Sequence, residues 1–224
     1  MIPSNQYYDH IAKDYNTHMT ESDNQVRNIV MNAFVKLVKA GNVVDFGGGT
    51  GLDLPRLLNN QYEVKFLEPS AAMREIAKSS LNSGQARPFF VEENTDFHDW
   101  SDTSLPFKEK VDGILANFAV LNCIEDIEFL FEKLSLICTP GCKIMASVID
   151  TFPIKMIGSY STAVAIKSLL NIPLTTQNNY KGVTQKTFLH TKSHYKTSSF
   201  KYFDFVSYSS IKSSHFAMLI LSKK

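Results

Sequence analysis

The sequence predicts an α/β protein whose seven strands form one doubly wound, mostly parallel sheet that ends in an antiparallel hairpin. Three observations predict this class. Short apolar runs typical of buried strands alternate with segments of helical periodicity, and such alternation implies parallel pairing. A turn rich in glycine follows the first apolar run. Near the end of the chain, two alternating segments are joined by a short polar link, as in a hairpin.

The individual elements follow from the period of the apolar residues and from start and stop signals. Two helices come first, because apolar side chains recur at helical spacing over 8–19 and 26–40, and Gly41 ends the second. Ser70 is a suitable N-cap for a helix over 70–81, and Pro55 fits the first turn of a helix over 52–59. A further helix is expected over 124–137. Strands are expected over 43–46, 63–67, 88–91, 111–116, 142–149, 200–208 and 215–222.

One domain is expected over residues 1–224, since the sequence shows no linker, repeat or low-complexity tract. Its parts are N-terminal helices at 1–40, a core at 41–150, a lid insertion at 151–190, and a final helix and strands at 191–224. The insertion is long for a connection within such a fold. Its amphipathic residues fit a helical lid, and they also fit a face packed on the core: Ile154, Met156, Ile157, Tyr160, Val164, Leu169 and Leu170.

Charge is unevenly distributed along the chain, although the formal net charge is only +1. Residues 151–224 contain ten lysines and a single acid, Asp204, whereas acids outnumber bases before them. One interpretation is two solvated faces of opposite sign. The other is a basic, partly apolar cover over a site for an anionic or electron-rich molecule.

The cysteines and apolar segments indicate a cytoplasmic protein without a membrane span. The three cysteines, Cys123, Cys138 and Cys142, do not form a disulfide framework, and they lack the further ligands of a zinc site, so no metal is expected. No secretory signal pattern opens the sequence. Lysines and hydroxyl residues interrupt the most apolar later segment, 154–174, which therefore reads poorly as a span.

The glycine-rich turn excludes two common ligand classes. It lies in VVDFGGGTG, residues 43–51. No Gly-Lys-Ser/Thr occurs, so the phosphate-binding loop of nucleoside triphosphatases is absent. The dinucleotide pattern G-x-G-x-x-G fails because its third glycine would fall on Leu52 or Leu54. The pattern present is G-x-G-x-G at Gly47, Gly49 and Gly51, with Asp45 two residues before it.

This stretch resembles the first motif of class I S-adenosylmethionine-dependent methyltransferases, two hydrophobic residues and an acid followed by x-G-x-G-x-G. The similarity extends over about residues 8–149 and more loosely over the final strands. YYDHIAKDY, residues 7–15, is similar to the N-terminal pattern of small-molecule and quinone methyltransferases. The resemblance implies a Rossmann-like fold, methyl transfer, and S-adenosylmethionine as cofactor with S-adenosylhomocysteine as product.

The cofactor would lie along the carboxyl ends of the first strands, in the core at 41–150. Glycines let the backbone approach a ligand, and free N–H groups of the next helix favour a carboxylate. Asp45 can face the ammonium of the methionine part, and Glu68, which ends the second strand in FLEPS, can accept both ribose hydroxyls. The resemblance places Asp96 and Phe97 at the adenine, Asn117 beside cofactor and substrate, and Tyr15 over the methionine end. Met73 is a further candidate near the adenine.

Catalytic residues are harder to infer, since an activated methyl group needs orientation more than acid–base help. The candidates for moving a proton are His98, next to Asp99, and His190 and His194, at the end of the lid segment. A magnesium-dependent site is not expected, because Asn117 stands where an acid would help and Asp150 is the only acid at the end of the fifth strand.

The acceptor is expected to be a small apolar or aromatic molecule, such as a natural product, a quinone-like compound or an isoprenoid. No nucleic-acid partner is expected, because no basic stripe with interleaved aromatic residues occurs. Two alternatives stay open. The lysine-rich last third allows a nucleic-acid or protein methyltransferase. An intact glycine motif also allows a cofactor-binding sensor or partner subunit without catalysis.

Overall fold

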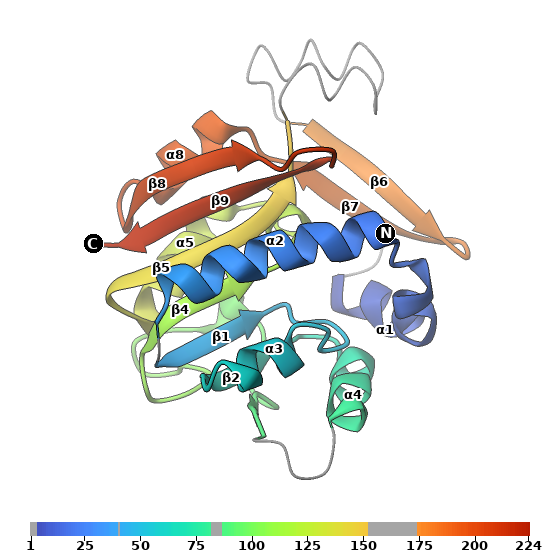
Figure 1. The fold of residues 1–224 in the computed structure, drawn as a ribbon, viewed down its shortest axis with the longest axis horizontal. Coiled ribbons are helices and arrows are strands. Elements are labelled where there is room, and N and C mark those ends of the chain that lie inside the picture. Colours follow the sequence, from blue (N-terminus) through green and yellow to red (C-terminus); the bar gives the residue numbers. More distant parts are fainter. Residues whose placement is uncertain (1–3, 40, 82–86, 152–173) are drawn as a thin grey trace.

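Seven strands form the main sheet of the computed structural model, which describes residues 4–39, 41–81, 87–151 and 174–224. Their order is β3-β2-β1-β4-β5-β9-β8 (Figure 1). The strands are β1 (Asn42–Phe46), β2 (Glu63–Leu67), β3 (Phe89–Phe90), β4 (Val111–Ala116), β5 (Cys138–Ile149), β8 (Phe203–Ser210) and β9 (Phe216–Lys223). The pairs from β3 to β5 are parallel, and β9 is antiparallel to both β5 and β8. The predicted fold class and terminal hairpin are confirmed.

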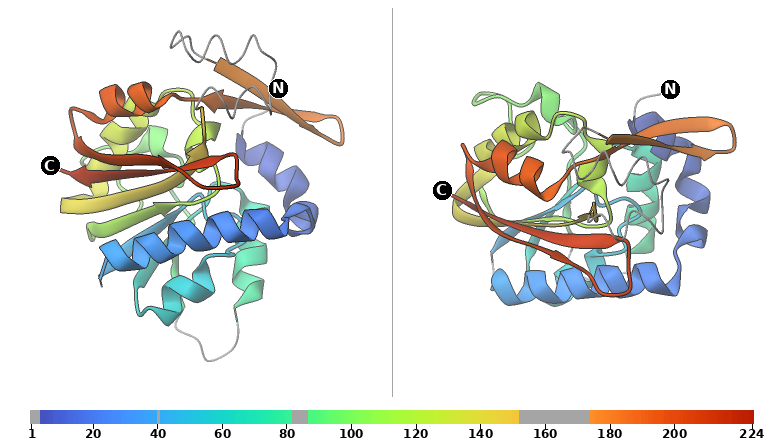
Figure 2. Two further views of the ribbon diagram at one scale, coloured as in Figure 1. Left: turned by 45° about the horizontal axis from the view of Figure 1, so that its top comes forward. Right: turned by 90° about the horizontal axis from the view of Figure 1, so that it is seen from above.

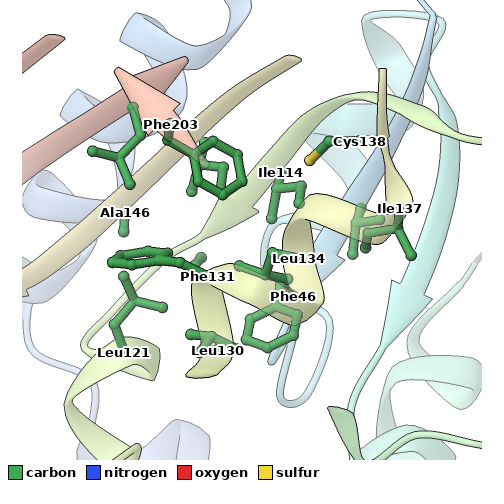
Figure 3. Packing of buried hydrophobic residues seen from close by; sticks show 14 of the residues in the cluster. Phe46, Ile114, Leu121, Leu130, Phe131, Leu134, Ile137, Cys138, Ala146 and Phe203 are labelled. Carbon is green, nitrogen blue, oxygen red and sulfur yellow. The ribbon is translucent and has the colours of Figure 1, made fainter. Parts of the chain in front are cut away.

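Alternate residues of the central strands enter two different cores, which is why these strands read as continuous apolar runs. Val43, Leu115 and Met145 pack in one core with α2 (Glu21–Leu37) and α3 (Leu54–Asn59). Their sequence neighbours pack in the other core with α5 (Ile127–Ile137) and α8 (Lys192–Ser199). Figure 2 shows the helices on opposite faces of the sheet, and Figure 3 shows Phe131 and Leu134 of α5 packed near Ile114 and Ala146.

Side-chain caps explain where several helices begin. Thr20 and Asp23 form a capping box that starts α2 five residues before the predicted position. Ser70 caps α4 (Ala71–Ser80) by accepting from the N–H of Met73, as expected. Asp126 caps α5 in the same way, so this helix begins at Ile127 after the short helix η3 (Val120–Cys123).

At the N-terminus, α1 (Ser4–Tyr15) is followed by η1 (Asn16–His18). The α-helix therefore begins earlier than the predicted range of 8–19, and the end of that range forms a turn of 3-10 helix. A third short helix, η2 (Phe97–Asp99), precedes β4.

The described part of the segment expected to form a lid contains a β-hairpin. Strands β6 (Leu174–Tyr180) and β7 (Val183–Leu189) form a separate two-stranded antiparallel sheet. Lys181 and Gly182, which connect them, have φ angles of +48° and +82°, as a two-residue hairpin turn requires. The seven apolar lid residues from Ile154 to Leu170 lie outside the described residues.

Candidate functional site

A cavity of about 790 Å³ lies at the carboxyl ends of β1, β2 and β4. Its size is within the range of small-molecule and cofactor sites. In an open parallel sheet this edge, where the strand order reverses beside the first strand, is where ligands bind. The walls come from the turn after β1, the end of β2, residues 95–98, the loop after β4, the helices α1 and α2, and Phe188 of β7.

The glycine turn brings bare backbone to the cavity wall. Gly47 and Gly49 have φ angles of +66° and +58°, a region that disfavours other residues. A Cβ atom on Gly47 would lie 2.5 Å from Cγ1 of Val120, whereas one on Gly49 would enter open space. Gly51, with φ +79°, is not among the cavity-lining residues, and its Cβ would lie 2.9 Å from Ala77 of α4. Its role is close packing of the turn.

Glu68 connects the end of β2 to the glycine turn. One carboxylate oxygen accepts from the N–H of Gly49 at 2.9 Å and the other from the N–H of Ser70 at 2.8 Å. Burial raises the pKa of Glu68, and these two N–H groups oppose that rise. A carboxylate offers about four acceptor positions, so each oxygen can also accept a hydroxyl from the cavity.

Asp45 carries a buried carboxylate oxygen, Oδ2, that has no hydrogen-bond partner within the described part of the chain. Its residue is 1% exposed and lines the cavity. Burial raises the pKa of Asp45 well above its usual value, and the nearby charges of Asp53 and Glu68 add to the rise. Such a group is stabilised by a cation that enters the cavity.

Arg27 and Asp53 form a largely buried ion pair that the sequence did not indicate. Nη1 of Arg27 lies 2.5 Å from Oδ2 of Asp53, and both residues line the cavity. Nε of Arg27 is buried and has no partner among the described residues. Burial raises the pKa of Asp53, and the charge of Arg27 opposes this. An acid just after the glycine turn was a signal for Asp53, but nothing local to α2 links Arg27 to it.

Asn117, a further candidate from the sequence, follows β4 and lines the cavity, and its amide is hydrogen-bonded within the protein. Its Nδ2 donates to Oδ2 of Asp53 at 3.2 Å, and its Oδ1 accepts from the hydroxyl of Ser147 at 2.8 Å. The following residues, Phe118 and Ala119, have left-handed φ angles of +70° and +62°.

Asp96, Phe97 and His98 lie together at the cavity wall. The carboxylate of Asp96 accepts from the backbone N–H of His98 at 3.0 Å and lies 2.6 Å from its Nδ1. The rings of Phe97 and His98 are 4.1 Å apart. The sequence suggested Asp99 as the carboxylate partner of His98, whereas the structure pairs His98 with Asp96, at an exposed position.

Helix α1 covers the cavity beside α4. Asp9 accepts from the hydroxyl of Ser70 at 2.6 Å and from the N–H of Ala72 at 3.0 Å, which fixes the two helices together. Tyr15 and the fully buried Met73, both candidates from the sequence, line the cavity. Burial raises the pKa of Tyr15 to about 12, so its phenol stays protonated at neutral pH.

Tyr8 of α1 was not predicted as a site residue. It also lines the cavity, and its hydroxyl lies 3.4 Å from Sγ of Cys123. Its helical spacing with Tyr15 in the N-terminal pattern was the available signal.

His190 and His194 are not among the described residues that line the cavity. Their Nδ1 atoms lie 3.1 Å apart, and Nε2 of His190 lies 2.8 Å from the carbonyl oxygen of Ile124. Burial lowers the pKa of His190 to about 4, so it is neutral at pH 7 and donates to that carbonyl. The pair lies behind Ile124 and Phe188, which do line the cavity.

The hairpin of β6 and β7 is fastened to α1. Asp14 accepts from the hydroxyl of Tyr180 at 3.0 Å and lies 2.6 Å from Nζ of Lys181. Gln185 donates to the hydroxyl of Ser4 at 2.7 Å. The two elements therefore close one side of the cavity together.

With this geometry in place, the comparison with known proteins identifies the family. The profile of the methyltransferase domain family matches residues 15–195, and the chain belongs to that family. An uncharacterized methyltransferase of Anoxybacillus flavithermus is 36% identical in an alignment of 81 residues that covers 33% of this chain and 37% of that relative. The match thus spans little more than a third of that relative's length.

Solved structures share the fold over nearly the whole chain. DhpI in its complex with SAH has a TM-score of 0.72 at 14% identity, covering 98% of this chain and 94% of its own. The glycopeptide N-methyltransferase MtfA, complexed with S-adenosyl-L-homocysteine, has a TM-score of 0.61 at 12% identity, covering 87% and 88%. The resemblance to class I methyltransferases found in the sequence is confirmed.

Among residues 4–39, 41–81, 87–151 and 174–224, no group of three or more His, Cys, Asp or Glu side chains could hold a metal ion. No helix in this described part is long and apolar enough to cross a membrane.

Proposed function

We propose that the chain uses S-adenosylmethionine to methylate a small apolar or aromatic acceptor, of natural-product or quinone-like kind. The observation that carries the proposal is a pair of buried atoms of opposite charge. Oδ2 of Asp45 and Nε of Arg27 both lack partners among the described residues, and both residues line the cavity. The amino-acid end of this cofactor carries an ammonium and a carboxylate, which would satisfy one atom each.

The remaining cofactor contacts are proposed from position. Glu68 has acceptor capacity left for ribose hydroxyls. Phe97, Met73 and Asp96 line the same cavity as Glu68 and would surround the adenine, and Asn117 and Tyr15 would border the methionine end. Gly47 and Gly49 supply the close backbone approach, with Gly51 acting through packing.

S-adenosylmethionine, when bound, supplies a methyl group already activated by a positively charged sulfur. The residues of this chain would orient the two reactants for in-line displacement and exclude water, which accounts for much of the rate in such reactions. Of the three candidate histidines, His98 lines the cavity, so it is the first choice for accepting a proton. His190 and His194 would act only through Ile124 or Phe188.

The part of the cavity wall that is not assigned to the cofactor supports an acceptor without negative charge. It combines uncharged residues with two acids, Glu125 and Asp126; the uncharged ones include Ser4, Asn5, Tyr8, Cys123 and Phe188. Carboxylates are the prevailing charged groups among the described lining residues, and Arg27 already pairs with Asp53. These features favour an electron-rich neutral acceptor over an anionic one.

The setting and the alternatives follow from other features. Three free cysteines in the described residues suit a reducing compartment, so the proposal includes a cytoplasmic enzyme. A nucleic-acid or protein methyltransferase and a non-catalytic cofactor sensor are the competing functions.

The test is binding of S-adenosylhomocysteine by isothermal titration calorimetry, followed by transfer of labelled methyl groups across an acceptor panel. Glu68→Ala should weaken binding by about 1–3 kcal/mol, because buried hydrogen bonds are lost. Glu63→Ala, at the exposed opposite end of β2, is the matched control and should bind normally.

Each result has a distinct meaning. No binding by the wild type overturns the proposal, and normal binding by Glu68→Ala removes Glu68 from the site. Binding without transfer to any acceptor favours the sensor. Steeply salt-dependent binding to RNA favours a nucleic-acid methyltransferase.

A further inference from the structure

Ser147 lies in β5, is fully buried, and is not among the cavity-lining residues, yet its polar atoms serve the cavity wall. Its hydroxyl accepts from the backbone N–H of Phe118 and donates to Oδ1 of Asn117. Its carbonyl oxygen accepts from the N–H of Ala119 at 2.8 Å. One residue of β5 thus contacts three consecutive residues of the loop after β4.

The loop that Ser147 holds has an unfavourable backbone. Phe118 and Ala119 are both left-handed, at φ +70° and +62°, and neither is a glycine. A non-glycine residue in this region costs on the order of 1 kcal/mol and persists where its surroundings require it. The ring of Phe118 is held between Phe216, with centroids 4.9 Å apart, and the guanidinium of Arg27, 5.4 Å from its centre.

A continuous chain of hydrogen bonds runs from Ser147 to the charged pair at the cavity. The hydroxyl of Ser147 donates to the carbonyl oxygen of Asn117, which turns the amide nitrogen toward Asp53 at 3.2 Å. Asp53 in turn accepts from Arg27 at 2.5 Å. Donors and acceptors alternate without conflict, and Nδ2 of Asn117 also donates to the carbonyl oxygen of Arg27 at 3.4 Å. The serine hydroxyl is therefore one of the contacts that orient the Asn117 amide.

We propose that Ser147 is a positioning residue of the cofactor site, acting through Asn117 on Arg27 and Asp53 and through backbone contacts on the Phe118–Ala119 turn. This inference rests on the proposed function. Ser147 helps to fix which way the Asn117 amide points, together with the carbonyl oxygen of Arg27 and the carboxylate of Asp53, and that amide contacts the ion pair. Removing the hydroxyl leaves the N–H of Phe118 and Oδ1 of Asn117 without this partner, so the amide loses one of the contacts that hold it toward Asp53.

The experiment compares S-adenosylhomocysteine affinity with thermal stability for four variants and the wild type. Ser147→Ala removes the hydroxyl, Ser147→Thr keeps it, and Ser147→Cys keeps the side-chain size with a weak hydrogen-bonding group. Ser199→Ala is the matched control, because Ser199 is also fully buried and, within the described part of the chain, its hydroxyl donates to the carbonyl oxygen of Lys196 in the same helix. Affinity is measured by calorimetry at a temperature well below each unfolding midpoint.

For Ser147→Ala the dissociation constant should rise about tenfold or more, as expected when a buried hydrogen-bond network is broken. Ser147→Thr should stay within about threefold of the wild type. Ser199→Ala should lower the unfolding midpoint and leave the affinity unchanged. If Ser147→Ala does not fold, Ser147→Cys carries the test with a rise of about threefold.

The inference is overturned if Ser147→Ala loses stability but binds within twofold of the wild type, which is the behaviour of a purely structural serine. It is also overturned if a folded Ser147→Thr binds as weakly as Ser147→Ala, or if Ser199→Ala weakens binding equally. A wild type that binds no S-adenosylhomocysteine overturns the proposed function itself. If the wild type binds it, any failure of these expectations concerns the role of Ser147 alone.

Discussion

Two left-handed turns border the cavity, and they reach the same backbone conformation by different means. In the turn after β1 the left-handed residues are glycines, at 47, 49 and 51. In the turn after β4 they are Phe118 and Ala119, held by Ser147 from a neighbouring strand. The first turn is encoded in its own residues, whereas the second depends on a contact about thirty positions away.

The two acids beside these turns, Asp45 and Asp53, also differ, because only one of them has a charged partner in the described chain. Asp45, before the glycine turn, has a buried oxygen without a partner in the described chain. Asp53, which Asn117 contacts, is paired with Arg27. The carboxylate of Asp45 can therefore be stabilised by a cation that enters the cavity, whereas the charge of Asp53 is already balanced by Arg27.

The largest expected effect comes from filling the glycine turn. Gly47→Ala adds a Cβ that would lie 2.5 Å from Val120, in addition to the left-handed strain. We expect a loss of about 2–4 kcal/mol in the free energy of unfolding, measured by urea denaturation, because overpacking and strain add. Weak binding of S-adenosylhomocysteine should accompany it.

The control for this prediction is Gly141→Ala. Gly141 has φ +81°, and an added Cβ would meet nothing within 4 Å, so only the backbone cost of about 1 kcal/mol remains. If both variants lose the same free energy of unfolding, contact with Val120 is unimportant. The requirement for glycine in the first turn would then come from backbone conformation alone.

An intermediate effect concerns pH. The pKa of Asp45 is raised in the folded protein, so the folded state binds more protons than the unfolded state above the ordinary carboxyl range. Stability from this group is therefore complete at low pH and is lost as pH rises through the raised pKa. Asp45→Asn should abolish that loss and be more stable than the wild type at pH 8, as measured by denaturation between pH 4 and 9.

Asp53→Asn tests the other half of the comparison. It leaves the buried guanidinium of Arg27 without its carboxylate, so it should destabilise the protein at pH 8, opposite in sign to Asp45→Asn. The same sign for both variants would contradict the distinction between an unpaired and a paired carboxylate.

The smallest expected effect comes from relaxing the second turn. Ala119→Gly removes the left-handed cost but adds flexibility to the unfolded chain, for a net gain of about 0.5 kcal/mol in unfolding free energy. Thermal denaturation should show a slightly higher midpoint. A clear loss of stability would mean that the methyl group of Ala119 contributes packing that outweighs its strain.

Much of the fold was predictable because its signals are local. The buried strands β1, β2 and β4 read as short apolar runs, and Ser70 marked the start of α4. The helix at 192–199 and the hairpin at 174–189 have weaker signals in the sequence. Both segments are rich in polar residues, and the hairpin has no turn signal besides Gly182. Apolar periodicity alone placed the start of α2 too late, because the helix begins directly after its N-cap, Thr20.

The residues of the candidate site also differ in whether a local sequence signal marks them. Of the predicted residues, Asp45, Gly47, Gly49 and Glu68 line the cavity because they lie at or just after the carboxyl ends of β1 and β2, and such strand ends of a parallel sheet meet at one edge. Arg27, Tyr8 and Ser147 were missed because their partners are distant in sequence, and no spacing relates a residue of α2 or β5 to the loop after β4.

The sequence by itself therefore determined the class of sheet, the position of the glycine turn and the methyltransferase family, because periodicity and backbone conformation are properties of neighbouring residues. Only the tertiary structure decided that Arg27 faces Asp53, that Ser147 holds Phe118 and Ala119, and that the hairpin is fastened to Asp14. These contacts join segments that are close only after the sheet has formed, and hydrogen bonds between such segments leave no periodic trace in the chain.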